Sequence, residues 1–201
     1  MARAQAVVDK MVATVNGGLR TDLITYSDLV WQLTLQPGTP QGNFTSADLN
    51  HALHLLIDQR LILQEAEKLP AITPTQQEID AARDDLAKRF PPGEFQPRLQ
   101  RVGLTREKLD EILDQRVRIE KYLDFRFRYF VVITQKEIAD YYHDVFVPRF
   151  RRQSPGGIVP TLENVAADIE RNLTEDKIES DTDTFLDAAR QRAEILMLSS
   201  L

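Results

Sequence analysis

Hydrophobic residues recur every three or four positions along most of the chain, which predicts a mostly helical protein. One stripe consists of Leu53, Leu56, Ile57, Leu61, Ile62 and Leu63, and another of Leu109, Ile112, Ile119, Leu123, Phe127 and Phe130. The first predicts a helix from about Ser46 to Lys68, and the second a helix that begins after Thr105 and reaches about Phe130. Further helices are expected over Tyr26–Leu35, Thr75–Arg89, Glu94–Val102 and Gln135–Val147, and a long charged one from Leu162 to about Arg192.

Three helix starts carry a threonine followed three residues later by an acidic or amide side chain. The pairs are Thr25 with Asp28, Thr73 with Gln76, and Thr134 with Glu137. A threonine hydroxyl can accept a hydrogen bond from a free backbone N–H, and the third residue can reach back to the cap. Pro74 would then stand at a first helical position, where its missing N–H costs nothing.

Two segments favour strands instead. The segment from Val7 to Gly18 is rich in β-branched residues and ends in Asn16-Gly17, which favours a turn. Ala193–Leu198 is a short apolar run that follows the last helix. Because an isolated strand is not stable in water, the simplest partner of each is the other. The expected fold is mostly α, a multi-helix domain with a small β-sheet formed by the N-terminal and C-terminal strands.

Composition narrows the function classes. The chain has 201 residues, of which 42% are hydrophobic and 28% charged, and this is typical of a folded protein. The net charge of -6 gives no general attraction to nucleic acid or to anionic membranes. No apolar run approaches the roughly 20 residues that span a bilayer. Met1–Gln5 lack the apolar stretch of a secretory signal, and the absence of cysteine is compatible with either redox compartment.

Candidate catalytic chemistry is sparse. His51 and His54 lie three residues apart on one expected helix, but no further ligands stand near them, so two surface histidines are the simpler interpretation. The acidic pair Asp84-Asp85 lacks the glycine of a calcium loop, and Asn16-Gly17-Gly18 lacks the spacing of a phosphate-binding loop. We therefore expect no catalytic residues, no metal and no cofactor.

Several short segments, in order, resemble the N-terminal chaperone domain of SurA and related parvulin-type foldases. They are Val15-Asn16-Gly17, Ile24–Leu29, Leu56–Ala66, Ile72-Thr73-Pro74, Gly103-Leu104-Thr105, Ile133–Tyr142 and Thr161–Val165. The resemblance implies a chaperone region over 1–148 and a returning helix and strand over 161–201. Between them lies the Pro/Gly-rich loop Arg149–Pro160, where many relatives carry a prolyl-isomerase domain of at least about 50 residues. A dozen residues leave no room for that domain.

The resemblance implies a non-catalytic holdase that binds unfolded or extended polypeptides, such as outer-membrane protein clients, in the periplasm or otherwise outside the cytoplasm. We expect Trp31, Leu35 and Phe44, beside the flexible segment 36–43, to line the mouth of a peptide-binding crevice. The alternative is that Trp31 and Leu35 are ordinary core residues.

Three other functions stay open. One is an assembly subunit, a homodimer that exchanges the Leu162–Arg192 arm or a strand. Another is a prolyl-isomerase-related protein. The interleaved aromatic and arginine residues of Tyr122–Phe130 are also conceivable as a nucleic-acid surface, which the net charge opposes. The simpler interpretation is that these aromatics pack in the core while the arginines reach water or acidic residues of the last helix.

Overall fold

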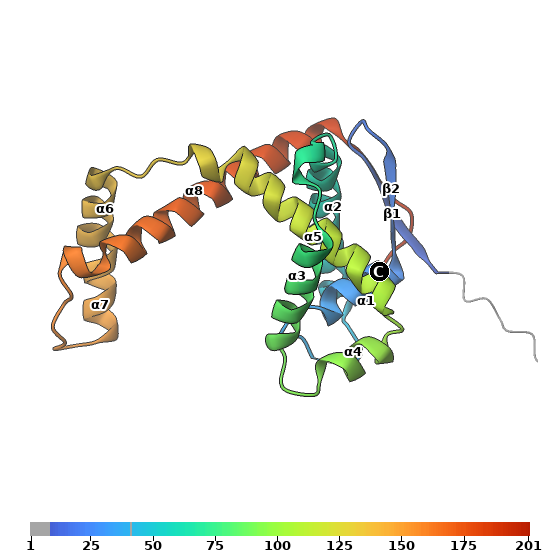
Figure 1. Cartoon of the computed structure of the whole chain (residues 1–201), viewed down its shortest axis with the longest axis horizontal. Helices are drawn as coiled ribbons and strands as arrows, with labels where there is room; N and C mark the ends of the chain where they lie inside the picture. Colours follow the sequence, from blue (N-terminus) through green and yellow to red (C-terminus); the bar gives the residue numbers. More distant parts are fainter. Residues whose placement is uncertain (1–8, 41) are drawn as a thin grey trace, which may run out of the picture. The chain divides into compact units, whose positions relative to one another are not determined.

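The computed structural model describes residues 9–40 and 42–201, and it is mostly helical with one three-stranded antiparallel sheet (Figure 1). The expected fold class is confirmed. The chain forms two compact units. One runs to Tyr122 and takes in Leu186–Leu201, and the other is Leu123–Phe185. Each is described by itself below.

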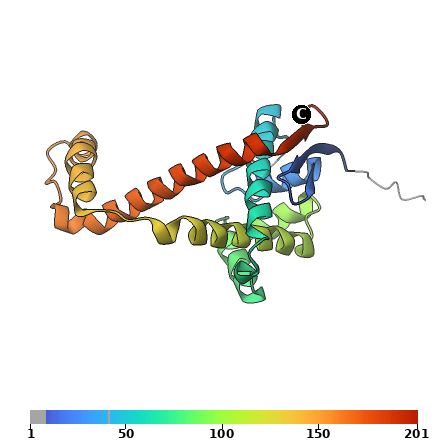
Figure 2. The ribbon, with the colours of Figure 1, turned by 90° about the horizontal axis from the view of Figure 1, so that it is seen from above.

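The sheet of the first unit brings the first and last strands together. Strand β1 (Met11–Asn16) lies between β2 (Thr21–Thr25) and β3 (Glu194–Met197), and both pairings are antiparallel. The pairing of the two terminal strands, expected from the sequence, is confirmed, and Figures 1 and 2 both show them side by side. Val7 and Val8, which the predicted strand included, lie outside the described residues. Strand β2 was not predicted, because its five residues show no distinctive alternation.

The turn between β1 and β2 is held against a helix by one glutamine. Gln64 is 1% exposed, and its Oε1 accepts a hydrogen bond from the Gly17 N–H at 2.9 Å. Its Nε2 donates to the Asp22 carboxylate at 2.7 Å and to the Val15 carbonyl at 3.3 Å. A Cβ at position 17 would stand 2.9 Å from Gln64 Oε1, so any side chain there would displace the Gln64 amide from its hydrogen bonds.

Behind the sheet stand helices α1 (Tyr26–Thr34) and α2 (Ser46–Ala66), which pack against each other. Both begin with a capping box, the first at Thr25 with Asp28 as expected. The second is at Thr45 with Asp48, a pair that the sequence analysis missed one residue before the predicted start. Each box satisfies two backbone N–H groups that the helix itself leaves without partners.

Three more helices complete the first unit: α3 (Gln76–Lys88), α4 (Phe95–Arg101) and α5 (Arg106–Arg126), whose last turn passes into the second unit. The predicted cap of α3 at Thr73 was wrong, because Thr75 caps the helix with Glu78 and Pro74 precedes the cap. A proline disfavours helical conformation in the residue before it, and Thr73 instead closes the short 3-10 helix η1 (Pro70–Ile72). The four helices α1, α3, α4 and α5 enclose a core of large apolar residues: Leu35, Ile79, Leu86, Phe90, Phe95, Leu99, Leu104, Leu109 and Leu113.

The second unit contains the 3-10 helix η2 (Arg128–Phe130), α6 (Gln135–Tyr141), the π-helical turn η3 (Tyr142–Phe146), α7 (Val147–Gln153) and most of α8 (Leu162–Arg192). The capping box at Thr134 and Glu137 is confirmed. Helical structure continues past Pro148 to Gln153, so the start of the expected loop at Arg149 was wrong. Pro148 sits near the start of α7, where a proline is tolerated. The non-helical connection to α8 begins at Ser154.

Within the part of the chain that the structure describes, none of the helices combines the length and the apolar character needed to cross a bilayer.

We expect Gln64→Leu to lower the free energy of unfolding by about 1–3 kcal/mol, because the Gly17 N–H and the Asp22 carboxylate both lose a buried partner. Urea unfolding followed by circular dichroism measures the change. The matched control is Gln77→Leu on the exposed face of α3, for which a change within about 0.5 kcal/mol is expected. Equal effects of the two substitutions would contradict the role given to Gln64.

Acid should weaken both units through their capping boxes. The pKa of Glu78 is lowered to about 2, chiefly because Lys121 Nζ donates to it at 2.7 Å and also because Thr75 donates to it. The pKa of Glu137 is lowered to about 2 by Lys177 and then by Thr134. A lowered pKa stabilises the folded state above the ordinary value of 4.5, and this stabilisation is lost as the pH falls through about 2.

The measurement is the difference in unfolding free energy between the wild-type protein and Glu78→Gln as a function of pH. We expect the difference to be largest above the ordinary glutamate pKa of 4.5 and to shrink as the pH approaches about 2. Glu137→Gln should behave in the same way. A difference that does not change over this range would show that these hydrogen bonds leave the acid stability unaffected.

Candidate functional site

A half-enclosed cavity in the first unit combines apolar and charged lining residues. Its volume is about 430 Å³, and it lies between α1, α4 and the segment that leads into α2. The lining residues are Tyr26, Val30, Thr34, Gly42, Asn43, Phe44, Arg98, Arg101 and Val102. Apolar side chains and two arginines therefore share one small space.

Arg98 is the buried charged residue of this cavity. The side chain is 6% exposed, its Nε donates to the Thr34 carbonyl at 2.7 Å, and its Nη2 donates to the Thr39 carbonyl at 2.7 Å. The guanidinium also stands 5.3 Å from the centre of the Phe90 ring. These contacts join α4 to the end of α1 and to the segment after it.

The electrostatic surroundings of Arg98 are unfavourable for a cation. Burial lowers the pKa of Arg98, and the positive charge of Arg101 lowers it further, while Glu94 acts in the opposite direction. Throughout residues 9–40 and 42–201, neither Arg98 nor Arg101 forms an ion pair with a carboxylate, and no acidic side chain lines the cavity. The cavity is therefore positively charged.

The three residues predicted to line a peptide crevice occupy different places. Phe44 lines the cavity. Leu35 is 2% exposed and belongs to the core between the helices, so it does not line the cavity mouth. Trp31 packs against that core, and its Nε1–H donates to the carbonyl of Val102, a lining residue, at 3.2 Å. Trp31 and Leu35 thus pack as core residues, which was the alternative interpretation. Peptide binding by Trp31, Leu35 or Phe44 stays a prediction.

The arginines of the cavity were missed by the sequence analysis. Arg98 and Arg101 are three residues apart on the short helix α4, a spacing common on exposed helix faces. Pro97 between them gave no hint that one of the two would be buried. Glu94 lies four residues before Arg98, the spacing of an ordinary surface ion pair, so the local sequence offered no signal that Arg98 would be buried.

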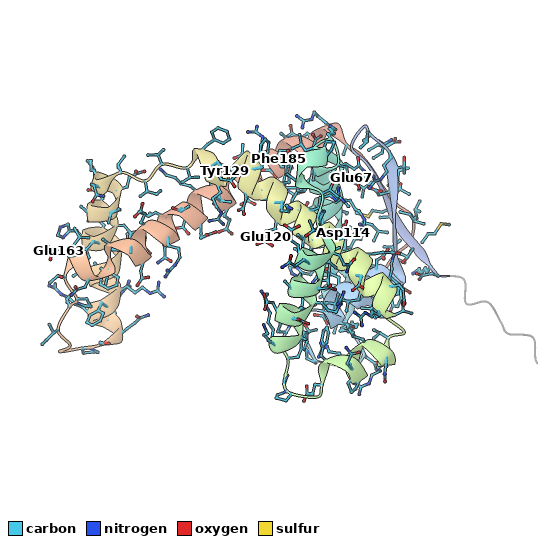
Figure 3. The ribbon with its side chains drawn as sticks, in the orientation of Figure 1. Glu67, Asp114, Glu120, Tyr129, Glu163 and Phe185 are labelled. Atoms are coloured by element: carbon cyan, nitrogen blue, oxygen red, sulfur yellow. The ribbon has the colours of Figure 1, made fainter. Side chains whose placement is uncertain are left out.

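In the second unit, the segment from Phe125 to Val132 exposes large apolar side chains. Tyr129 is 78% exposed, Phe130 75% and Val132 72%, and Phe125 is about half exposed. The expectation that the aromatics of this segment pack in the core was wrong for these three rings and right for Phe127, whose ring lies 6.2 Å from that of Phe185. Figure 3 labels Tyr129 and Phe185.

Polar contacts hold this segment in place. Arg128 donates to Glu175 of α8 at 2.9 Å and to Asp124 at 2.6 Å, so the expected contact with an acidic residue of the last helix is confirmed for Arg128. Lys177 Nζ donates to the Val132 carbonyl at 2.9 Å. The apolar side chains are thus exposed on an anchored backbone.

The histidines show no sign of a metal site. His51 and His54 are both exposed on α2. Across the described residues, no group of three or more His, Cys, Asp or Glu side chains has an arrangement able to hold a metal ion.

The chain matches no protein-family model. Nor does any curated protein match its sequence significantly.

The hydrogen bonds of Arg98 lead to a further expectation. Arg98→Met should keep the packing volume but lose two bonds to backbone carbonyls, and hydrogen bonds to charged groups contribute about 1.5–3 kcal/mol each. Because the substitution also removes a buried charge, which offsets part of this loss, the free energy of unfolding should fall by about 2–4 kcal/mol. Urea unfolding gives the value. Arg106→Met, at an exposed arginine of α5, is the control and should change it by less than about 0.5 kcal/mol.

Proposed function

We propose that this protein is a non-catalytic holdase, a chaperone that binds unfolded or extended polypeptides and releases them without nucleotide or covalent chemistry. The observation that carries the proposal is the exposed apolar surface of Phe125, Tyr129, Phe130 and Val132. Folded proteins rarely leave neighbouring large apolar side chains in water, and such surfaces mark sites of protein interaction.

The energetics suit reversible binding. Full burial of one large apolar side chain contributes about 1.5–3 kcal/mol, and ordering a flexible client opposes this gain. Contacts with a few such rings give weak binding, and any polypeptide with exposed apolar side chains can make them. A holdase needs this tolerance, because its clients share exposed hydrophobic residues and no common motif.

The anchoring of the surface also supports the proposal. Arg128 bridges to Glu175, and Lys177 donates to the Val132 carbonyl, so the backbone that carries the rings is fixed to α8. The charged side chains beside the rings stay hydrated, which favours solubility of the protein when no client is bound.

A second apolar surface lies on the sheet of the first unit. Leu23 of β2 and Leu196 of β3 both stand opposite Thr14 of β1, on the face that alternates with buried Ala13 and Val15, and both are 42–50% exposed. Strands β2 and β3 are the two edges of the sheet. An extended client could add hydrogen bonds at such an edge.

A location outside the cytoplasm is part of the proposal and is supported by the resemblance to SurA alone.

The test measures the aggregation of a chemically unfolded outer-membrane protein after dilution, by light scattering, with and without the purified chain. We expect the wild-type protein to delay aggregation and the double substitution Tyr129→Ser and Phe130→Ser to reduce this effect severalfold. The matched control is Tyr129→Phe with Phe130→Tyr, which keeps both rings and should keep the activity. Circular dichroism confirms that each variant is folded.

The outcomes separate the alternatives. If the wild-type protein leaves aggregation unchanged, the holdase proposal fails. An obligate dimer in solution scattering that binds no hydrophobic peptide would instead favour an assembly subunit. Saturable turnover of a proline-containing peptide would favour a prolyl isomerase.

A further inference from the structure

We propose that the cavity around Arg98 and Arg101 binds a free carboxylate that belongs to an apolar residue, and that its source is the C-terminal residue of a polypeptide. The peptide source rests on the proposed holdase function, whereas the carboxylate chemistry depends only on the cavity. The same chemistry is available from a free acylated amino acid, and the experiment below distinguishes the two sources.

The first argument is the charge of the cavity. Arg98 is buried, and its two described hydrogen bonds go to neutral backbone carbonyls. A buried cation without a counter-charge is costly, and the neighbouring Arg101 adds a second positive charge. An anion in the cavity would lower the cost of burying Arg98 and the repulsion between Arg98 and Arg101.

The second argument is the hydrogen-bonding capacity that is left over. A guanidinium carries five N–H donors on three nitrogens. The Nε and Nη2 atoms of Arg98 donate to Thr34 and Thr39, and no partner of Nη1 is found among the described residues. Arg98 lines the cavity, so its remaining N–H groups border the space that a ligand would fill. Arginine presents paired N–H groups in the geometry that a carboxylate accepts.

The third argument is the apolar part of the lining. Val30, Phe44 and Val102 face the same space as the two arginines. The volume of about 430 Å³ falls within the roughly 300–1,000 Å³ of ligand pockets, which is room for one aromatic or branched residue. An aspartate or glutamate inside a client would supply the carboxylate but would leave the apolar walls uncovered. A C-terminal Phe, Leu or Val supplies the carboxylate and the apolar group on one Cα atom.

The chain contains its own probe for the test. Trp31 is the single tryptophan of the sequence, and its Nε1–H donates to the carbonyl of Val102 in the cavity wall. Its fluorescence should therefore respond when the cavity is filled. Titrations use three ligands: a short peptide that ends in Phe with a free carboxylate, the same peptide as its C-terminal amide, and N-acetylphenylalanine.

We expect the free-acid peptide to bind about tenfold more tightly than the amide, a difference of about 1.4 kcal/mol. Raising the salt concentration should reduce this preference. Arg101→Gln should abolish most of the preference, and because Arg101 is exposed, this variant should fold normally. Arg106→Gln, an exposed arginine outside the cavity, is the matched control and should keep the preference.

Equal binding of acid and amide would overturn the inference, and so would a preference that survives in Arg101→Gln. Binding of N-acetylphenylalanine without binding of the peptide would overturn the polypeptide source and keep the carboxylate chemistry. If the acid preference is found but the chain does not delay aggregation, the holdase proposal fails and the cavity assignment stands. If aggregation is delayed but the free-acid and amide peptides bind equally, the holdase proposal stands and the assignment of the cavity to a carboxylate fails.

Discussion

The first unit depends on the pairing of β1 with β3. Strand β1 is the central strand of the sheet, so without β3 only the β1–β2 hairpin would remain. An isolated hairpin is marginally stable in water, and this one would rest on its contacts with α1 and α2 alone. The ladder runs from Ala13 opposite Met197 to Asn16 opposite Glu194. It is extended by the Leu198 N–H, which donates to the Val12 carbonyl at 2.8 Å. Beyond the ladder, the side-chain Nζ of Lys10 donates to the Ser200 carbonyl at 2.8 Å. The fold thus relies on contacts between residues nearly the whole chain apart.

This pairing requires that the last part of α8 reach the sheet. Residues of α8 up to Phe185 belong to the second unit, and from Leu186 onward the helix belongs to the first. Arg190 then forms two hydrogen bonds to Asp58 of α2, at 2.7 and 2.8 Å. Shortly after Arg190 the chain enters β3, and Figure 2 shows the end of α8 passing into this strand. Gln64, two turns further along α2, holds the β1–β2 turn. Helix α2 therefore organises both partners of β1.

The two units present different chemistry to a ligand. The second exposes aromatic rings on an anchored segment, the surface that we propose for binding apolar side chains. The first contains a small cavity in which Arg98 and Arg101 stand beside Val30 and Phe44. An exposed apolar surface selects little among ligands, whereas a charged cavity discriminates among them. A polypeptide that exposes apolar residues and ends in one could use both.

The sequence alone determined most of the helices and the capping boxes of α1 and α6, because local rules produce them: helical periodicity in α2 and α5, and a threonine with an acid three residues later in α1 and α6. The pairing of the terminal strands was predicted because neither strand is stable by itself, although the pairing joins residues nearly the whole chain apart. Tertiary structure decided what depends on neighbours distant in the sequence. Burial of Arg98 follows from carbonyls of Thr34 and Thr39, more than fifty residues earlier, and Leu35 became core because α3, α4 and α5 close over it. Tyr129 and Phe130 are exposed because the chain leaves α5 in a 3-10 turn that buries Phe127 instead. Periodicity identifies which residues can be buried, and the packing of remote segments selects those that are.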